Sequence, residues 1–475
     1  MLKSCCEQTF EHAKGFYVSK HTTTECFLFP DLFDKPVVAR FDQEHSSTDG
    51  GALLLKAADR RLGLIDTLSR CLPDEREPGK IQHDLTDLIS QRVYGLACGY
   101  ADCNDAARLV DDPIHKALLG RDPIDGAALA SQSTLSRFEN AVGPKDLYRF
   151  GEALADSVIR RHRKRLRGKA RCITIDLDPT DDPTHGQQQF SFFNGHYDNW
   201  CYLPVLGFLS FNDEVEQYLF AAVLRPGNVT AKLGAVGILR RVIDRLRVAF
   251  PGTRLLVRLD GGFACPELLD FLDDQPRLDY VVAIAKNKVL ERRAKRLMGR
   301  ARRLSRESKK TERVFGECHY AAGSWIYKRR VVIKAEVTRL EGREPKNNPR
   351  FVVTNLRNTP RAVYKRYRQR GDVENRIKEL QHGLQIDRTS CTRFWANQFR
   401  VLLTATAYVL MQELRLNAKH TGCARAQVST LRERLLKVGV WIEVSVRRIV
   451  LHLPTSYPFK RDWGRLALAL GATAG

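Results

Sequence analysis

The sequence has no apolar run long enough to span a bilayer. A transmembrane helix needs roughly 20 consecutive apolar residues, and no stretch of this 475-residue chain approaches that length. The first residues, Met1 to Lys14, also lack an apolar segment followed by a cleavage site, so we expect no signal peptide. These absences exclude the usual membrane and secretory signals and predict a cytoplasmic protein.

The sequence also lacks the closely spaced cysteine pairs that are typical of zinc sites. The 12 cysteines are scattered, and none belongs to a Cys-x-x-Cys pair. Cys98 and Cys103 come closest to a metal-ligand spacing, but the segment after them offers no matching pair. We therefore expect reduced thiols and no zinc site. Internal repeats and low-complexity tracts are absent too. A length of 475 residues suits two or three domains, and a hydrophobic content of 43% is ordinary for a globular protein.

Positive charge is what the chain has in excess. It contains 78 Lys and Arg against 55 Asp and Glu, a net charge of +23. Such an excess predicts a polyanionic partner, either nucleic acid or an anionic membrane surface. Because the membrane signals are missing, nucleic acid is the better prediction.

Helical periodicity dominates the first third of the chain. Residues 1–45 are weakly patterned, with a short strand possible at 27–29, whereas 46–170 carries apolar stripes at helical spacing. Ser131–Glu139 predicts a helix capped by Ser131 or Ser133. Its small polar start followed by Arg137 is similar to a helix-turn-helix recognition helix, although an ordinary capped helix has the same pattern. We expect region 46–170 to be helical and to bind DNA. The basic run 160–167 is either a solvated helix end or a phosphate contact.

The pattern changes to alternating β-type sequence after Gly168. The expected order is strand, strand, strand, helix, strand, helix, strand, at 172–178, 202–208, 218–224, 231–250, 254–260, 268–271 and 280–285. This is the order of a ribonuclease-H-like α/β fold, in which the ends of the first and fourth strands lie side by side. That arrangement would bring Asp178 near Asp260.

The remaining segments follow this core, whose first part is 171–286. Residues 286–313 hold 13 Lys or Arg and three acids, which predicts an exposed helix. We take 287–350 as a partly β insertion, with its clearest strand at 325–334. Residues 351–416 would complete the core, ending in an apolar helix at 395–416, and 417–475 would form a C-terminal region with a strand near 449–451.

The stretch Tyr367–Leu380 predicts one amphipathic helix. Steps of three and four place five polar residues on one face: Tyr367, Arg370, Glu374, Lys378 and Gln381. A carboxylate flanked by cations suits a metal ligand beside a polyanion, although a solvated charged face gives the same pattern.

Three carboxylates on separate elements could hold two divalent cations. Asp178, Asp260 and Glu374 are the predicted set, and Mg²⁺ suits them because it prefers oxygen ligands, with Mn²⁺ able to substitute. Asp176 and Asp178 lie two apart on one strand and share a face, so either could be the first ligand.

Several motifs together resemble the DDE transposases of bacterial insertion sequences. The first site reads Asp-x-Asp-x-Thr-Asp-Asp-Pro-x-His-Gly-Gln over Asp176–Gln187, the second is Arg258–Phe263, and the third is Tyr-(2)-Arg-(3)-Glu, ending at Glu374. The resemblance also covers 91–97, 99–100, 104–105, 131–139, 224–228 and 394–398, and runs from about 40 to 415.

This resemblance implies cut-and-paste chemistry on double-stranded DNA by a homodimer. Asp178, Asp260 and Glu374 would be the metal ligands, with Asp178 favoured over Asp176 because Asp-x-Thr matches the broader family pattern. Tyr367 and Arg370 would contact phosphates or brace the glutamate helix. Many relatives carry a lysine seven residues after the glutamate. Here that position is Gln381, so the phosphate contact is either missing or supplied by Lys378. Trp325 would stack on a flipped base, or pack as a core strand residue.

Two alternatives remain open from the sequence. A ribonuclease-H-like nuclease or resolvase would use the same carboxylates without a joining step. A non-catalytic DNA-binding repressor would not need them, and the intact carboxylate set argues against it.

Overall fold

The computed structural model describes residues 26–473, which divide into two units between Ser46 and Ser47. In the first unit, β1 (Cys26–Phe29) and β2 (Val37–Arg40) form an antiparallel hairpin with exposed side chains. The short strand expected at 27–29 is therefore present. The rest of the description concerns the second unit.

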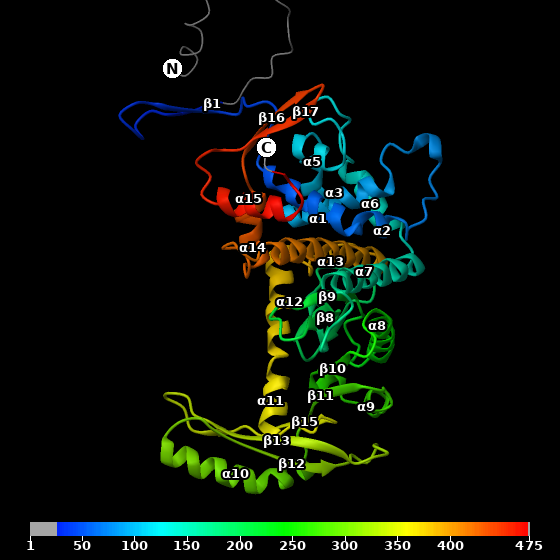
Figure 1. Ribbon diagram of the computed structural model, residues 1–475, viewed down its shortest axis with the longest axis vertical. Coiled ribbons are helices and arrows are strands. Elements are labelled where there is room, and N and C mark those ends of the chain that lie inside the picture. The colour runs from blue at the N-terminus through cyan, green and yellow to red at the C-terminus, as the bar shows by residue number, and fades with distance from the viewer. Residues whose placement is uncertain (1–25, 474–475) are drawn as a thin grey trace, which may run out of the picture. The chain divides into compact units, whose positions relative to one another are not determined.

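A mixed sheet forms the centre of the second unit (Figure 1). Its core strands are β4 (Cys172–Pro179), β8 (Val205–Phe211), β9 (Tyr218–Val223), β10 (Arg254–Leu259) and β11 (Leu278–Ile284). β8 and β9 follow β4 in antiparallel pairs, whereas β10 lies parallel to β4 on its other side and β11 lies parallel to β10. The predicted ribonuclease-H-like order is confirmed.

Two crossover helices make the parallel pairs possible. α8 (Ala235–Ala249) connects β9 to β10, and α9 (Pro266–Asp273) connects β10 to β11. α8 buries an apolar stripe that includes Leu239, Val242 and Leu246. The helix expected from 231 begins later because Gly234 has a positive φ of 76°, a conformation that glycine adopts easily. A small sheet of β5 (Asp182–Pro183), β6 (Phe192–Asn194) and β7 (Asn199–Tyr202) was not predicted.

The expected insertion is part of the central sheet. β12 (Glu312–Tyr320), β13 (Arg329–Thr338) and β15 (Arg350–Thr354) continue it beyond β11, and β14 (Lys346–Asn347) pairs with β13. The strand expected at 325–334 starts four residues late because Trp325 lies in the turn before it. Trp325 packs there against Tyr320 and the guanidinium of Arg329.

The basic helix α10 (Lys288–Ser308) exposes its charged side, as expected, but it is not exposed all round. It buries Leu290, Ala294 and Met298 against β12 and β13. Apolar residues at steps of four are enough for this, although the helix is strongly basic overall.

The helix expected at 367–380 is divided in two. α11 (Pro360–Arg368) ends before Gln369, and α12 (Gly371–Leu384) begins after Arg370. Figure 1 shows α11 and α12 end to end as one yellow rod. The prediction of a single helix was wrong in placing Tyr367 and Glu374 on the same helix. The expected apolar helix is α13 (Phe394–Asn417), which is buried along almost its whole length.

Helices make up the region before the core, as predicted. They are α1 (Leu53–Leu62), α2 (Leu64–Ser69), α3 (Leu85–Cys98), α4 (Cys103–Ala107), α5 (Pro113–Leu118), α6 (Gln132–Ala141) and α7 (Pro144–Arg165). A buried ion pair between Arg92 and Glu139 ties α3 to α6. After α13 follow α14 (Val428–Leu431), β16 (Val440–Ser445), β17 (Arg448–His452) and α15 (Lys460–Ala469), so the strand expected near 449–451 is present. Across residues 26–473, no helix combines the length and apolarity that crossing a membrane requires.

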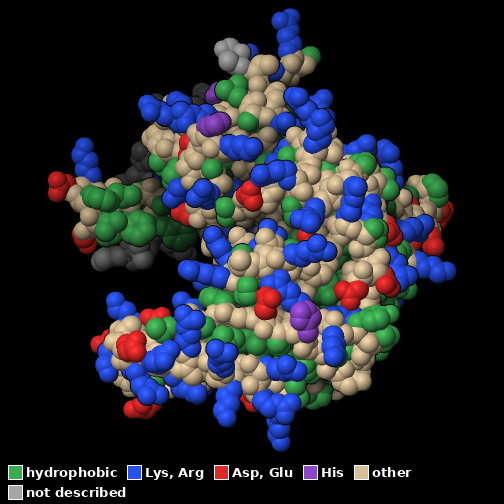
Figure 2. Space-filling model, turned by 60° about the horizontal axis from the view of Figure 1, so that its bottom comes forward, with side chains coloured by type: hydrophobic (Ala, Val, Ile, Leu, Met, Phe, Trp, Pro, Cys, Tyr) green, Lys and Arg blue, Asp and Glu red, His purple; other side chains and the backbone are tan. Residues whose placement is uncertain are grey.

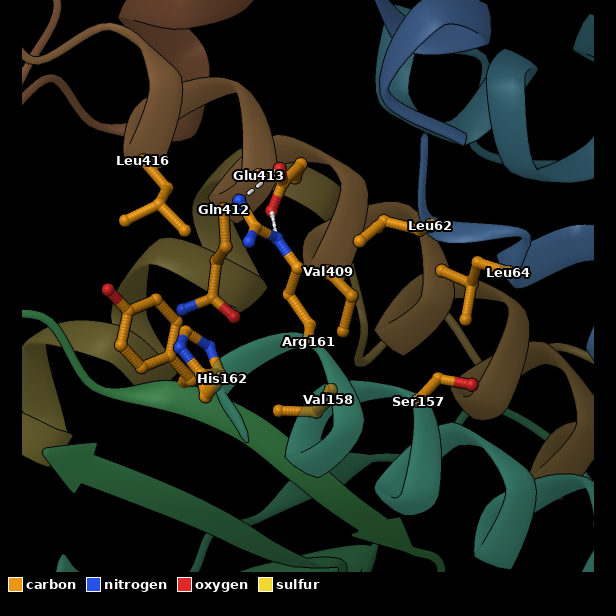
Figure 3. Close-up of a pocket in the computed structure, with 11 residues that line it drawn as sticks. Leu62, Leu64, Ser157, Val158, Arg161, His162, Val409, Gln412, Glu413 and Leu416 are labelled. Carbon is orange, nitrogen blue, oxygen red and sulfur yellow. Dashed lines mark hydrogen bonds and ion pairs between the residues drawn. The ribbon is translucent and has the colours of Figure 1, made fainter. Parts of the chain in front are cut away.

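The junction of α7 with α13 holds a buried histidine (Figure 3). His162 stacks on Phe211 and Tyr218, and Arg165 Nε donates to its Nδ1 over 3.1 Å. The neighbouring Arg161 pairs with Glu413. Burial, helped by Arg165 and Arg161, places the pKa of His162 well below its usual 6.5. The imidazole is therefore neutral in the folded protein.

We expect this histidine to make the protein acid-sensitive. Below about pH 6.5 the unfolded chain takes up a proton at this position that the folded chain does not, so stability present above pH 6.5 is lost as the pH falls. Replacing His162 by phenylalanine should reduce the change in the free energy of unfolding between pH 7.5 and pH 5.5. Urea unfolding of both proteins at pH 7.5 and 5.5 checks it. An equal loss in the two proteins would show that other groups are responsible.

Candidate active site

The carboxyl ends of two parallel strands place the first two carboxylates. Asp176 on β4 lies opposite Arg258 on β10, so Asp178 and Asp260 extend the same register by two residues. Asp178 is part of β4, whereas Asp260 follows β10 and caps the short 3₁₀ turn Gly261–Phe263 by accepting from Gly262 N over 2.9 Å. The ends of β4 and β10 lie side by side, as predicted.

One guanidinium joins the first and third carboxylates. Arg370 Nη1 donates to Asp178 Oδ2 over 2.8 Å, and its Nη2 donates to Glu374 Oε1 over 3.2 Å. Arg370 lies at the junction of α11 and α12, one turn before Glu374. The break between the two helices therefore puts this arginine beside the end of β4, with Glu374 57% exposed at its outer side.

The pKa of the Asp178 carboxyl is raised. Burial is the largest cause, and the charges of Asp260 and Glu374 add to it, so that its pKa rises to about 7 despite the opposing charge of Arg370. Asp260 and Glu374 in turn help to raise the pKa of Arg370 against the effect of its burial. The three carboxylates thus act on one another electrostatically, and Arg370 only partly neutralises them.

Asp176 has a different role from Asp178. It is fully buried, and Arg258 Nε and Nη2 hold its two oxygens at 2.8 and 2.7 Å. Arg258 Nη1 also donates to the backbone oxygen of Arg366 on α11 over 3.2 Å. A carboxylate held on both oxygens in this way is a structural anchor that ties β4 and β10 to the α11–α12 junction. Metal ligation by Asp176 stays a prediction, and in this structure Arg258 donates to both of its oxygens.

Other predicted residues of this helix pair take different positions. Tyr367 is half-buried on α11 beside Tyr364, and burial raises its pKa. Lys378 is exposed on α12. Gln381 Nε2 donates to Thr180 Oγ1 over 3.1 Å, so the residue that replaces the lysine of relatives ties α12 to the loop after β4.

Two predicted DNA-binding residues lie on elements outside this cluster. Trp325 lies in the turn between β12 and β13, not within a strand, as described above. Arg137 is exposed on α6, where Nη2 donates to Thr134 Oγ1 over 3.3 Å. α6 begins after Ser131, as expected, but the Ser131 hydroxyl bonds Ser133 and Thr134 side chains and makes no bond to the helix backbone.

Sequence reasoning missed two residues of this region. Arg258 stands two residues before Asp260 in the quoted motif. Since β10 was expected to pair with the strand of Asp176, Arg258 could have been suggested as the partner of Asp176. Tyr197 lies in the loop between β6 and β7, and burial followed by the charges of Asp181, Asp178 and Asp260 raises its pKa to about 12. No spacing in the sequence connects Tyr197 with the strand ends.

A second cluster of ligand-type side chains lies away from these carboxylates. Asp49, Cys98 and His115 are buried with one ligand atom each within 4.8 Å of the others. His115 Nε2 lies 2.9 Å from Asp49 Oδ2, and Lys437 Nζ lies 2.6 Å from Asp49 Oδ1. Burial opposes ionisation, but these bonds from His115 and Lys437 hold the pKa of Asp49 below its usual value. Since the Lys437 ammonium already neutralises the carboxylate, we assign the cluster a structural role.

The family comparison agrees with the geometry of the strand ends. A model described as Transposase DDE domain group 1 matches residues 29–472. The chain belongs to the DDE transposase family. A search of curated proteins found no significant match. The mixed sheet of this transposase is the fold that the family implies, and its activity on DNA follows at the level of the family.

Proposed function

We propose that this transposase cleaves phosphodiester bonds at the ends of a bacterial insertion sequence and joins the freed 3′-hydroxyl to target DNA. Asp178, Asp260 and Glu374 would be the catalytic carboxylates. The observation that carries this proposal is the Arg370 guanidinium bonded to both Asp178 and Glu374, with the charge of Asp260 acting on the same groups. Residues far apart in sequence thus form one acidic cluster on rigid elements.

The chemistry of this cluster fits divalent cations. All three donors are carboxylates, which suit Mg²⁺ or Mn²⁺. Burial, with the charges of Asp260 and Glu374, raises the pKa of Asp178, so added positive charge would favour its ionised form. Asp178, Asp260 and Glu374 would hold the ions. When bound, two such ions activate the attacking oxygen and stabilise the leaving oxygen of a phosphodiester.

The transposase's own side chains would do the positioning. Arg370 partly neutralises Asp178 and Glu374, and its guanidinium has the donor geometry to bind a phosphate oxygen instead. Arg258 and Asp176 fix the end of α11, and Gln381 fixes α12 against Thr180. Tyr367 braces the junction, while the exposed Lys378 is free to contact phosphate.

Double-stranded DNA is the proposed substrate, both as element ends and as target. We retain region 46–170, with Arg137 on α6, as the part that grips element ends, and 171–286 with 351–416 as the catalytic core. Residues 287–350, including Trp325, and 417–475 would be accessory. Cutting both ends together implies a homodimer on DNA in the bacterial cytoplasm.

A two-stage assay tests the proposal. The purified protein is mixed with a labelled duplex carrying the terminal repeats that flank its gene, with supercoiled plasmid and Mg²⁺. We expect nicks at the repeat boundary and then joined plasmid products. Nicks without joined products would favour the nuclease or resolvase, and binding without nicks would favour the repressor.

Metal binding should depend on pH through Asp178. Its pKa of about 7 means that a bound proton competes with the metal at lower pH, so affinity should rise about tenfold between pH 6 and pH 8. The free energy of unfolding without metal should change in the opposite direction. The folded protein keeps the Asp178 proton up to a pKa of about 7, whereas the unfolded chain loses it near its ordinary pKa of 3.8, so stability falls as the pH rises from about 4 toward 7. Mn²⁺ titration followed by thermal shift checks both. Asp178→Asn should abolish the pH difference, and its persistence in that variant would contradict the assignment.

A further inference from the structure

α10 displays a dense set of cations. Its 21 residues include nine Lys or Arg and two acids. Eight of these cations are exposed: Lys288, Arg292, Arg293, Lys295, Arg296, Arg300, Arg303 and Arg306. Within residues 26–473 none of the nine joins an ion pair, and the ion pairs on the neighbouring strands run from Arg313 and Lys334 to Glu336. The helix therefore has uncompensated positive charge over its whole length.

Other basic stretches of the transposase are different in this respect. In the run at 160–167, Arg161 pairs with Glu413 and Arg165 pairs with Glu214. Those arginines hold the fold together. The cations of α10 make no such contribution, so internal structure does not explain them.

The helix presents its charge as an ordered row. Burial of Leu290, Ala294, Met298 and Ala301 fixes which side faces the sheet. At about 100° per residue, Arg292, Arg296 and Arg303 then point directly away from it. At 1.5 Å rise per residue, Arg292 to Arg303 spans about 16 Å along the helix axis. That length is enough to reach several phosphates of one DNA strand, which advance by about 3.4 Å along the duplex axis.

A hollow extends this basic surface to one side. It has a volume of about 510 Å³ and lies between α10 and the segment around β14. Its cationic lining consists of Lys286, Arg292, Lys295 and Arg302. Figure 2 turns this side of the molecule toward the reader, and Lys and Arg side chains outnumber acidic ones on the surface seen there.

α10 also lies on the other face of the sheet from the catalytic helix pair. Val332 and Val352 pack with Tyr364 of α11, whereas Val331 and Ile333 belong to the cluster that contains Leu290 and Met298. Figure 1 shows α11 and α10 on opposite sides of β12 and β13. The charged helix is thus separate from the face on which Arg370 and Glu374 lie.

We propose that the exposed row of α10 binds the phosphate backbone of double-stranded DNA, outside the segment that is cleaved and without regard to sequence. Three features favour DNA over an anionic membrane. The apolar face of α10 is already buried, so no apolar surface remains to insert among lipids. The cations form a row that matches a linear polyanion, and the same chain carries the acidic cluster that acts on DNA. Only this choice of polyanion rests on the proposed function.

Salt-dependent binding of the full-length protein to DNA tests the surface. A variant with Arg292→Gln, Arg296→Gln and Arg303→Gln should lower the slope of log affinity against log salt by about two to three, because each phosphate contact contributes about 0.9. The loss should be equal on a duplex ending at the terminal repeat and on an unrelated duplex, since phosphates carry no base information. Lysine at the same three positions should keep the slope. Mg²⁺-dependent nicking at saturating DNA should remain at the wild-type rate.

A matched variant controls for net charge. Arg171→Gln, Arg254→Gln and Arg388→Gln remove the same charge from exposed arginines that lie outside region 46–170 and each have their own carboxylate partner. An unchanged slope in the α10 variant, or an equal fall in the control, would overturn the proposal. So would binding of the wild type to phosphatidylserine vesicles that depends on the same three arginines while DNA binding does not. If the wild type binds DNA but never nicks it, the proposed function fails and the α10 proposal is still tested by its slope.

Discussion

Replacing Glu374 by glutamine is expected to reduce Mg²⁺-dependent nicking of element-end DNA by about 1,000-fold or more, on the order of 4 kcal/mol of transition-state stabilisation. Glutamine keeps the size of the side chain and can still accept a bond from Arg370 Nη2. It removes the negative charge that a divalent cation requires. Because Glu374 is more than half exposed, the fold should not change. Nicking rates measured at saturating DNA and Mg²⁺ check this prediction.

Asp372 provides the matched control for this experiment. It is an exposed carboxylate in the first turn of the same helix, two residues before Glu374. Asp372→Asn should nick at close to the wild-type rate, and both variants should bind end DNA with wild-type affinity. A Glu374→Gln protein that nicks normally would remove Glu374 from the site. Equal losses in the two variants would show that the helix needs its charge for another reason.

Replacing Glu379 by alanine is expected to destabilise the transposase by about 3–5 kcal/mol, because it removes the more deeply buried of the two carboxylates that pair with Arg415. Glu379 is on α12 with a side chain only 1% exposed, and it pairs with Arg415 on α13. It also accepts from Tyr408 Oη over 2.9 Å and from Val428 N over 2.8 Å. These bonds clamp the helix that carries Glu374 onto the most buried helix of the fold. Urea unfolding gives the free energy directly.

An exposed neighbour controls for the substitution itself. Asn375 lies on the outer side of α12, and Asn375→Ala should change stability by no more than about 0.5 kcal/mol. Glu379→Gln keeps the acceptor oxygen but loses the charge, so its loss of stability should lie between the losses of Asn375→Ala and Glu379→Ala. A loss below about 1 kcal/mol for Glu379→Ala would mean that Arg415 is satisfied by Glu216, its other partner at 2.7 Å.

Local patterns in the sequence were sufficient to predict the catalytic sheet. β4 carries Asp178 near its carboxyl end and β10 is followed directly by Asp260, and the helix between β9 and β10 makes the parallel pairing possible. Chain order therefore predicted that Asp178 and Asp260 end neighbouring strands. The third position depended on the motif around Glu374, since nothing in the periodicity of α12 distinguishes a metal ligand from a solvated glutamate.

Contacts between distant residues could not be predicted in the same way. Asp176 and Asp178 lie two residues apart on one strand, so the sequence places both on the same face. Only the structure shows that Asp176 is the one that pairs with Arg258, 82 residues away. The joining of β13 and β15 to the central sheet is likewise a pairing between distant segments, so those residues looked like a separate insertion. The break between α11 and α12 lies beside the bond from Arg258 to the Arg366 backbone oxygen, which is again a non-local contact.

The most direct test of the three-carboxylate site is a crystal structure of the transposase with Mn²⁺ and element-end DNA, in which anomalous scattering locates the metal. We predict anomalous peaks bonded to Asp178, Asp260 and Glu374, with Arg370 rotated from Asp178 toward a DNA phosphate and Asp176 still paired with Arg258. Peaks bonded to Asp176 or to the Asp49, Cys98 and His115 cluster, with none at Asp178 and Glu374, would contradict the account.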